Sequence, residues 1–363
     1  MPQDDQWVPL LLPSEIRRMD RESLIREIRE IKAQYKEKMA ILAHHYQKDE
    51  IVELADKRGD SLELARYSAR LKKAKYIIFC GVAFMVEAAA ILCREDQKVY
   101  FPAPDAGCPL ADMAEEGDVK RAWGELSRIL DVGKIIPITY VNSPTELKAF
   151  CGERGGIVCT SSNADKIMEW AFQKGEKILF MPDENLGRNT CNALGMQREE
   201  VIVWNPQLDG GGCDKDAVRK AKAILWKGFC HVHLNFTAQQ VKMARENYPG
   251  CRIIVHPECQ EDVVNLSDAA GSTSRIIQYV EESPPESAIV IGTESNLVKR
   301  LAKEHPDKTI VELSHSECPD MARVTLRNLH FVMKYLGDFN VVEVEEPIAS
   351  HARLALERML EVK

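Results

Sequence analysis

The sequence predicts an α/β protein built from repeated domains with small parallel sheets, and two observations support this. Short apolar runs alternate with amphipathic runs between residues 40 and 335. Such alternation is typical of parallel sheets that are covered by helices on both faces. The length of 363 residues is also too great for one small core. It suits two or three units of roughly 100–150 residues each.

The first predicted element is a helix at 14–39, because Ser14 can cap it and apolar positions recur at helical spacing. Apolar runs then predict strands at 40–44, 76–80, 99–102, 135–141, 157–160, 178–181, 201–204, 252–256, 288–291 and 309–313. Amphipathic runs predict helices at 49–57, 61–71, 82–92, 143–150, 164–173, 216–224, 237–248, 272–281, 296–304, 320–335 and 348–360.

The order of these elements repeats three times. Strands that begin near residues 40, 136 and 252 each end in a polar cluster, and each is followed by a small-residue turn and then an acidic loop. A period of about 100 residues indicates triplicated domains rather than a solenoid. We place the domains at 14–112, 113–228 and 229–339, with a C-terminal helix within 340–363 packing on the first. Ligands of open parallel sheets bind beyond the carboxyl ends of the strands, so three such domains would enclose a central cavity.

Composition limits the possible partners. The formal net charge is −8, and an acidic surface disfavours nucleic acid. The N-terminus carries no recognisable signal peptide, and Glu87 interrupts the most apolar long segment, so no membrane partner is expected. The 11 cysteines are odd in number and scattered, which favours a reducing compartment with thiols free for metal. We therefore expect a cytoplasmic protein.

Three cysteines stand out by their context. Cys108 and Cys318 each precede a proline, which fixes the chain so that a thiolate can face a metal from a loop. Cys230 lies at the mouth of a predicted strand that also carries His231 and His233. The intervals of 122 and 88 residues differ from the Cys-x-x-Cys pairs of zinc ribbons and ferredoxins, so spacing alone does not select these residues.

Nine short motifs in a fixed order resemble those of the A-type, iron–sulfur quinolinate synthases. They are 43–47 (AHHYQ), 59–62 (GDSL), 105–113 (DAGCPLADM), 140–142 (YVN), 159–164 (CTSSNA), 226–233 (WxGxCxVH), 256–259 (HPEC), 271–273 (GST) and 318–321 (CPxM). The stretch 184–225 lies outside the motifs, and the sequence assigns it no role.

The resemblance implies a transferase that condenses iminoaspartate with dihydroxyacetone phosphate to give quinolinate, phosphate and water in NAD biosynthesis. It also implies functional coupling to an L-aspartate oxidase, which supplies iminoaspartate, and three domains in pseudo-threefold array. One 4Fe–4S cluster would be held by Cys108, Cys230 and Cys318, leaving one iron open as a Lewis acid. Cys259 is the chief alternative ligand.

The same resemblance assigns the site residues. His44 and Ser61 would hold one carboxylate, while Tyr140, Asn142 and Ser161 would hold the rest of iminoaspartate. The helix that follows Ser272 and Thr273 suits the phosphate. The expected catalytic residues are Tyr46, His256 and Glu258. His256 and Glu258 would also bind substrate, and Glu258 would be the general acid/base with a pKa raised by burial. His233 is expected only to support the cluster region.

Other interpretations stay open at this point. An iron–sulfur hydro-lyase of a hydroxy acid would also use an open iron but needs no phosphate site. A non-enzymatic iron–sulfur redox protein would use four protein ligands, and a zinc site of Cys and His would be colourless. His44 and His45 could be structural, Glu258 could pair with a surface cation, and Ser272 and Thr273 could simply cap a helix.

Overall fold

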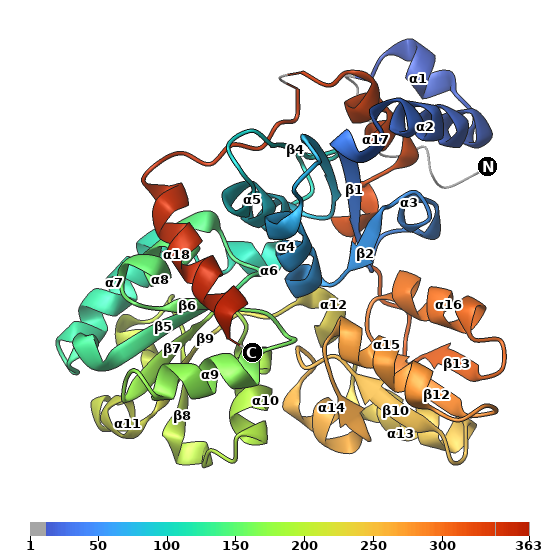
Figure 1. Ribbon diagram of the computed structural model, residues 1–363. Helices are drawn as coiled ribbons and strands as arrows, with labels where there is room; N and C mark the ends of the chain where they lie inside the picture. The colour runs from blue at the N-terminus through green and yellow to red at the C-terminus, as the bar shows by residue number, and fades with distance from the viewer. Residues whose placement is uncertain (1–11, 338, 363) are drawn as a thin grey trace. The chain divides into compact units, whose positions relative to one another are not determined.

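The computed structural model of the chain describes residues 12–337 and 339–362 (Figure 1). Their strands form three parallel sheets of four, five and four strands, each accompanied by helices. The predicted α/β class with small parallel sheets is confirmed. The chain divides into two compact units. The first contains residues up to Gly107 together with Cys318–Val344, and the second contains Cys108–Glu317 and the residues from Glu345 onward.

The first unit holds the first sheet, whose strand order is β2-β1-β3-β4. Its strands are β2 (Lys57–Gly59), β1 (Met39–His44), β3 (Tyr76–Cys80) and β4 (Lys98–Tyr100). Its helices before Gly107 are α1 (Ser14–Arg18), α2 (Arg21–Tyr35), α3 (Asp49–Val52), α4 (Ser61–Arg70) and α5 (Ala83–Leu92), with a 3-10 turn at Lys36–Lys38. All six residues of β1 are buried, as expected for a central parallel strand.

The predicted helix at 14–39 is wrong in its extent. The chain leaves helical geometry at Met19, and Asp20 caps α2 by accepting a hydrogen bond from the Ser23 N–H. The caps determine this break, because an aspartate at a helix start competes with a continuous helix. The last residue of the prediction, Met39, already belongs to β1.

The segment after Cys318 joins the first unit rather than the third predicted domain, so that part of the predicted boundary is wrong. It contains a 3-10 turn at Met321–Arg323 and helix α17 (Leu326–Lys334), which packs on α2. The buried His330 places Nε2 2.8 Å from Glu27 Oε2. This contact and the packing of α17 on α2 join the segment to the first unit.

The second unit contains the second sheet, of order β6-β5-β7-β9-β8. Its strands are β6 (Ile157–Cys159), β5 (Ile135–Tyr140), β7 (Lys177–Met181), β9 (Ala223–Trp226) and β8 (Val201–Trp204). The accompanying helices are α6 (Pro109–Asp112), α7 (Glu116–Ser127), α8 (Thr145–Glu153), α9 (Ala164–Phe172), α10 (Glu184–Ala193) and α11 (Lys215–Lys220). β9 occupies the end of the helix predicted at 216–224. It is fully buried between β7 and β8, and an apolar run in that environment favours a strand.

The third sheet also belongs to the second unit and has the order β11-β10-β12-β13. Its strands are β11 (Ala269–Ala270), β10 (Arg252–Val255), β12 (Ala288–Gly292) and β13 (Thr309–Glu312). The helices here are α12 (His231–Leu234), α13 (Ala238–Asn247), α14 (Glu261–Leu266), α15 (Thr273–Glu282) and α16 (Ser295–Glu304). A division of the second unit at residues 228 and 229 stays a prediction.

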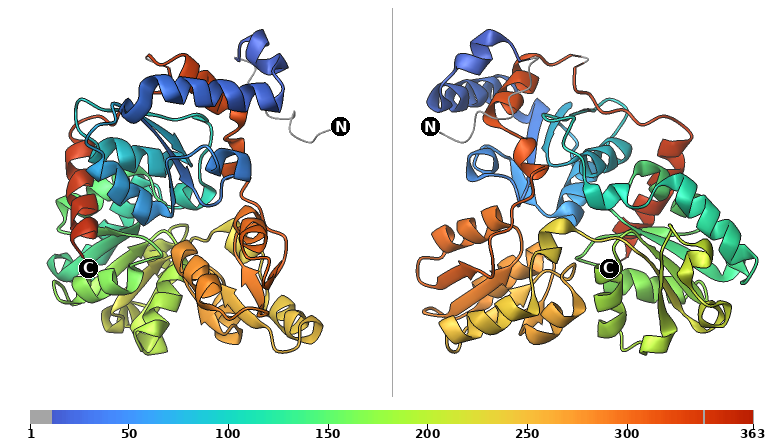
Figure 2. Two further views of the ribbon diagram at one scale, coloured as in Figure 1. Left: turned by 45° about the vertical axis from the view of Figure 1, so that its right-hand side comes forward. Right: turned by 180° about the vertical axis from the view of Figure 1, so that it is seen from behind.

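The C-terminal helix α18 (Ile348–Glu361) packs on α8 and β6 in the second unit (Figure 2), so its predicted place on the first domain is wrong. The backbones of α8 and α18 approach each other closely at Gly152, which fixes α18 on α8. A side chain at Gly152 would put its Cβ 1.9 Å from the His351 carbonyl oxygen, so only glycine fits there. Arg358 Nη1 donates to the Gly156 carbonyl oxygen at 2.6 Å. Among the described residues, no helix is both long and apolar enough to span a membrane.

Candidate active site

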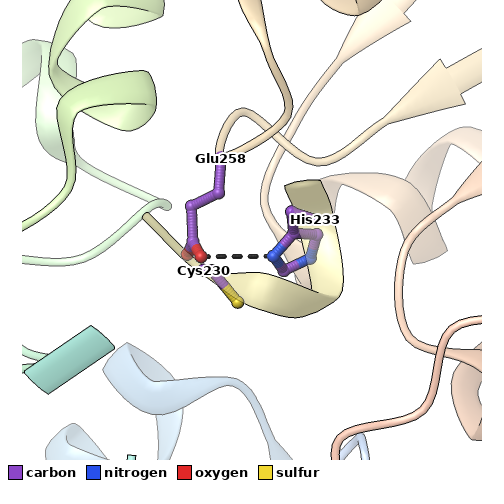
Figure 3. Close-up of side chains that lie close together, drawn as sticks. All are labelled: Cys230, His233 and Glu258. Carbon is purple, nitrogen blue, oxygen red and sulfur yellow. Dashed lines mark hydrogen bonds and ion pairs between the residues drawn. The ribbon is translucent and has the colours of Figure 1, made fainter. Parts of the chain in front are cut away.

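A buried carboxylate forms the centre of the candidate site in the second unit. Glu258 follows β10 and is 2% exposed. The Tyr140 hydroxyl, at the end of β5, donates to Glu258 Oε1 at 2.5 Å. His233 Nδ1 lies 3.2 Å from the other carboxylate oxygen, Oε2 (Figure 3). The structure therefore brings together Tyr140 and Glu258, both predicted as site residues, and adds His233, which was expected only as support.

Two stacked imidazoles border this carboxylate. The rings of His233 and His256 lie 4.1 Å apart at an angle of 20°. The backbone N–H of Glu258 donates to His256 Nδ1 at 3.3 Å. Burial and the neighbouring His233 lower the pKa of His256 to about 3, so its ring is neutral at pH 7. Since Nδ1 accepts a hydrogen bond, Nε2 carries the proton of the neutral ring and is the nitrogen that can donate.

The pKa of Glu258 moves in the direction opposite to the prediction. Burial by itself raises the pKa, but the two histidines and the hydrogen bonds from His233 and Tyr140 outweigh burial and lower it to about 2. The expectation of a raised pKa omitted these partners. Glu258 is therefore an ionised hydrogen-bond acceptor and a potential base, rather than a stored acid.

Cys230 places a thiol beside this group. Ligand atoms of Cys230, His233 and Glu258 all lie within 4.8 Å of one another. Burial raises the pKa of the Cys230 thiol well above its usual value, and Glu258 and the nearby Cys108 add to this rise. Thiols and a carboxylate crowded in this way repel one another as anions, and a bound cation would relieve that repulsion. The donor set thus fits a metal group.

The local fold around Cys230 differs from the prediction. Cys230 precedes the short helix α12, on which His231 and His233 lie, so the predicted strand there is wrong. Successive side chains from His231 to His233 therefore do not alternate between two faces as they would on a strand. His233 is buried all the same, and His231 is partly exposed. An apolar-polar alternation of only four residues fits one turn of helix equally well, so sequence could not decide between them.

The loop before Cys230 is held by close backbone contacts. Gly228 approaches Pro182 so closely that a Cβ would lie 2.3 Å from the Pro182 carbonyl oxygen. The Gly228 carbonyl oxygen accepts the Glu184 N–H at 2.9 Å, and Trp226 Nε1 donates to the Met113 carbonyl oxygen at 2.7 Å. The orientation of the thiol therefore depends on the second sheet and on the residues after Cys108.

A serine pair holds the loop that leads to Cys318. The buried Ser316 donates through Oγ to the Val232 carbonyl oxygen at 2.8 Å, and its N–H donates to Ser295 Oγ at 2.9 Å. The Ser295 N–H returns a hydrogen bond to the Ser316 carbonyl oxygen at 2.8 Å. Ser316, two residues before Cys318, thus joins the loop after β13 to α12.

Polar residues beyond β5 and β6 offer ligand contacts. The buried Asn142 Oδ1 has no hydrogen-bond partner among the described residues. Asn163 Oδ1 accepts from Thr160 N and Oγ1 at 2.7 and 3.1 Å, which shapes the turn that presents the partly exposed Ser161 before α9. An unpaired buried amide oxygen is costly, and a ligand donor would satisfy it.

The predicted phosphate residues lie at the start of α15. Ser272 Oγ accepts from the Arg275 N–H at 3.3 Å, so Ser272 is the N-cap of this helix. Ser272 and Thr273 are both buried. Ser272 therefore caps α15, and binding of a phosphate at this helix start would be a second role.

The remaining predicted residues belong to the first unit and are described there alone. His44 ends β1, its Nδ1 accepts from the Tyr46 N–H at 3.1 Å, and the two rings lie 4.7 Å apart at 84°. Ser61 begins α4, which Asp60 caps. The Cys318 carbonyl oxygen accepts the Ala322 N–H at 3.1 Å.

Comparison with known proteins places the chain. Residues 26–361 match the family model described as quinolinate synthetase A protein. The quinolinate synthase of Bacillus cereus strain G9842 is 44% identical over 361 residues, which is 98% of both chains. Those of B. cereus strain Q1 and of Bacillus anthracis strain CDC 684 / NRRL 3495 are each 45% identical, with the same coverage. The chain belongs to the quinolinate synthase family, an enzyme family of NAD biosynthesis.

Proposed function

We propose that this enzyme condenses iminoaspartate with dihydroxyacetone phosphate to give quinolinate, phosphate and water. The observation that carries the proposal is the buried Glu258 with Tyr140, His233 and Cys230 around it. Forming the pyridine ring requires removal of protons and loss of water, and both steps are assisted by a positioned base and a hydrogen-bond donor. L-aspartate oxidase would supply the unstable iminoaspartate.

The proton transfers are assigned to one ionised group, Glu258, and to two groups that carry a proton, His256 and Tyr140. Glu258 is ionised because its partners lower its pKa to about 2, so it has a site for a proton, although the same partners make it a weak base. The neutral His256 holds a proton on Nε2, and the Tyr140 hydroxyl holds one against Glu258 Oε1. Such a set can take a proton from substrate at one point and deliver one at another. Tyr46 is proposed as a further relay.

Substrate binding is proposed from the motif residues. His44 and Ser61 bind one carboxylate, and Tyr140, Asn142 and Ser161 bind the rest of iminoaspartate, with His256 and Glu258 close to the reacting atoms. The unpaired Asn142 Oδ1 supports this. Ser272 and Thr273 bind the phosphate, and their position at the start of the ten-residue helix α15 supports an anion there.

The cofactor proposal concerns three cysteines. The family is an iron–sulfur family, and none of the 11 cysteines, all of which lie among the described residues, forms a disulfide. We assign Cys108, Cys230 and Cys318 as ligands of one 4Fe–4S cluster with one iron left open, which would supply a Lewis acid. Cys259 is packed in the core of the third sheet with Val255 and Val290, which argues against it as a ligand. Cysteines that form no disulfide among the described residues also support the cytoplasm as the compartment.

One experiment tests the proposal. The protein is purified without oxygen, its iron and sulfide are measured, and quinolinate formation is assayed with iminoaspartate generated by an L-aspartate oxidase. We expect a brown protein that forms quinolinate, with iron lost in Cys230→Ala and kept in Cys259→Ala. A colourless protein with zinc would instead favour a zinc site at Cys230, His233 and Glu258. Turnover of hydroxy acids that survives Ser272→Ala would favour a hydro-lyase, and a cluster without turnover would favour a redox protein.

A further inference from the structure

Asn189 lies on α10, inside the stretch 184–225 that the family motifs leave unassigned. Its Nδ2 donates to two carbonyl oxygens, those of Pro257 and Cys259, both at 2.8 Å. These two residues flank Glu258 in the chain. Both N–H groups of one buried amide are therefore used on the peptide groups at either side of the candidate catalytic carboxylate.

The helix that carries Asn189 is firmly attached to the second sheet. Asp183 caps α10 by accepting the Leu186 N–H at 2.7 Å. Gly187 lets the helix lie against β7 and β9, since a Cβ there would lie 2.8 Å from Leu225 Cδ2 and 2.9 Å from Phe180 Cδ1. Asn189 sits half a turn beyond this contact, so its position is set by the second sheet.

Tyr140 ends a strand of the same sheet, whereas Glu258 follows a strand of the third sheet. The hydrogen bond between them therefore joins two sheets. Two backbone hydrogen bonds of the Glu258 loop come from the third sheet and from the loop itself. The His256 N–H donates to the Gly292 carbonyl oxygen at 3.0 Å, and the Cys259 N–H donates to the His256 carbonyl oxygen at 3.0 Å. Asn189 instead holds the loop from α10, which packs on the second sheet, the sheet that carries Tyr140.

We propose that Asn189 is a positioning residue: it fixes the Glu258 loop to the sheet that carries Tyr140 and so sets the geometry of the Tyr140–Glu258 pair. The inference rests on the proposed function for its catalytic consequence. A general base must lie within hydrogen-bond reach of its proton, and small displacements are costly. The amide is suited to this task because a carboxylate at position 189 would face two carbonyl oxygens with no donor.

The chain offers a matched control. Asn192 lies on the same helix, and its Nδ2 donates to Glu261 Oε1 at 2.8 Å. It is exposed, and its partner is three residues beyond Glu258. Asn192→Ala therefore removes an asparagine hydrogen bond from the same helix to the first residue of α14, without touching the peptide groups that flank Glu258.

The test compares Asn189→Ala, Asn189→Asp and Asn192→Ala in the anaerobically purified protein. We expect Asn189→Ala and Asn189→Asp to lower kcat for quinolinate on the order of 10- to 100-fold, with KM for both substrates within about threefold of the parent. Iron and sulfide content stays at the parental level. Asn192→Ala keeps the parental kcat.

A second measurement does not depend on activity. Hydrogen–deuterium exchange of peptides that cover residues 256–260 is compared in the same proteins. We expect faster exchange in Asn189→Ala, with the β10 and β12 peptides unchanged, and no change in Asn192→Ala. If Asn189→Asp does not fold because it buries a charge, Asn189→Ala alone decides.

The outcomes separate the two proposals. Parental kcat and parental exchange in Asn189→Ala overturn the positioning role, and so does an equal loss in Asn192→Ala. A parent protein that forms no quinolinate overturns the proposed function. Loop exchange then still reports whether Asn189 holds the loop.

Discussion

Removing one oxygen atom tests the centre of the site. Tyr140→Phe deletes the hydroxyl that donates to Glu258 Oε1 at 2.5 Å and leaves the ring in its buried place. A hydrogen bond to a charged group contributes about 1.5–3 kcal/mol. If this bond is needed in the transition state, that range corresponds to a roughly 10- to 150-fold lower kcat/KM, at about 1.4 kcal/mol per tenfold.

The assay is steady-state quinolinate formation in the iron-loaded protein at saturating and at limiting dihydroxyacetone phosphate. Tyr248→Phe is the control, because Tyr248 is 38% exposed and its hydroxyl has no role in the proposed mechanism. Its kcat/KM should match that of the parent. A Tyr140→Phe enzyme with kcat/KM within twofold of the parent, at equal iron content, would refute the assignment of this hydroxyl to the reaction.

Three further predictions follow from the geometry. Gly228→Ala places a Cβ 2.3 Å from the Pro182 carbonyl oxygen, so the Cys230 loop must shift and the iron content of the purified protein should fall. The control is Gly124→Ala, because the space around a Cβ at this position is open. Its iron content should stay at the parental level, and its free energy of unfolding in urea should rise by about 0.5–1 kcal/mol. Ser316→Ala removes a buried donor and should lower the free energy of unfolding by about 1–3 kcal/mol; an unchanged urea midpoint would contradict this. His45 helps to hold the pKa of Glu63 at about 2, below its usual 4.5. This depressed pKa stabilises the fold above about pH 4.5 and the contribution is lost as the pH falls towards 2, so Glu63→Gln should flatten the acid side of the stability–pH curve; an equally steep curve would argue against it.

Sequence predicted the strands best where apolar runs are short and bounded by turns. β3 coincides with the predicted strand at 76–80, and β8 coincides with that at 201–204. Prediction failed at β9, where the helical reading of 216–224 ran past Lys220. The polar residues of α11 and the apolar residues of β9 are separated by two residues only. Burial between β7 and β8, which decides the outcome, is a tertiary contact.

The site was predictable in its residue types and not in its pairings. Motifs placed Tyr140 and Glu258 on the list of site residues. These two residues are 118 positions apart in the chain and lie at or just after the ends of strands from different sheets, so no local pattern encodes their contact. The direction of the Glu258 pKa depended on that contact and on His233, so it was predicted wrongly. Asn189 was missed because its partners are carbonyl oxygens, which leave no trace in side-chain composition.

The chain leaves the second unit at Glu317 and returns to it only at Glu345. On the ribosome, the strands of that unit emerge long before α18, because α18 follows all of them in the chain. Until then, the surface of α8 and β6 that α18 later covers stays open to water. α18 must therefore be made before this part of the protein can reach its final stability, and a chain truncated before Ile348 would expose the surface of α8 and β6 that α18 covers.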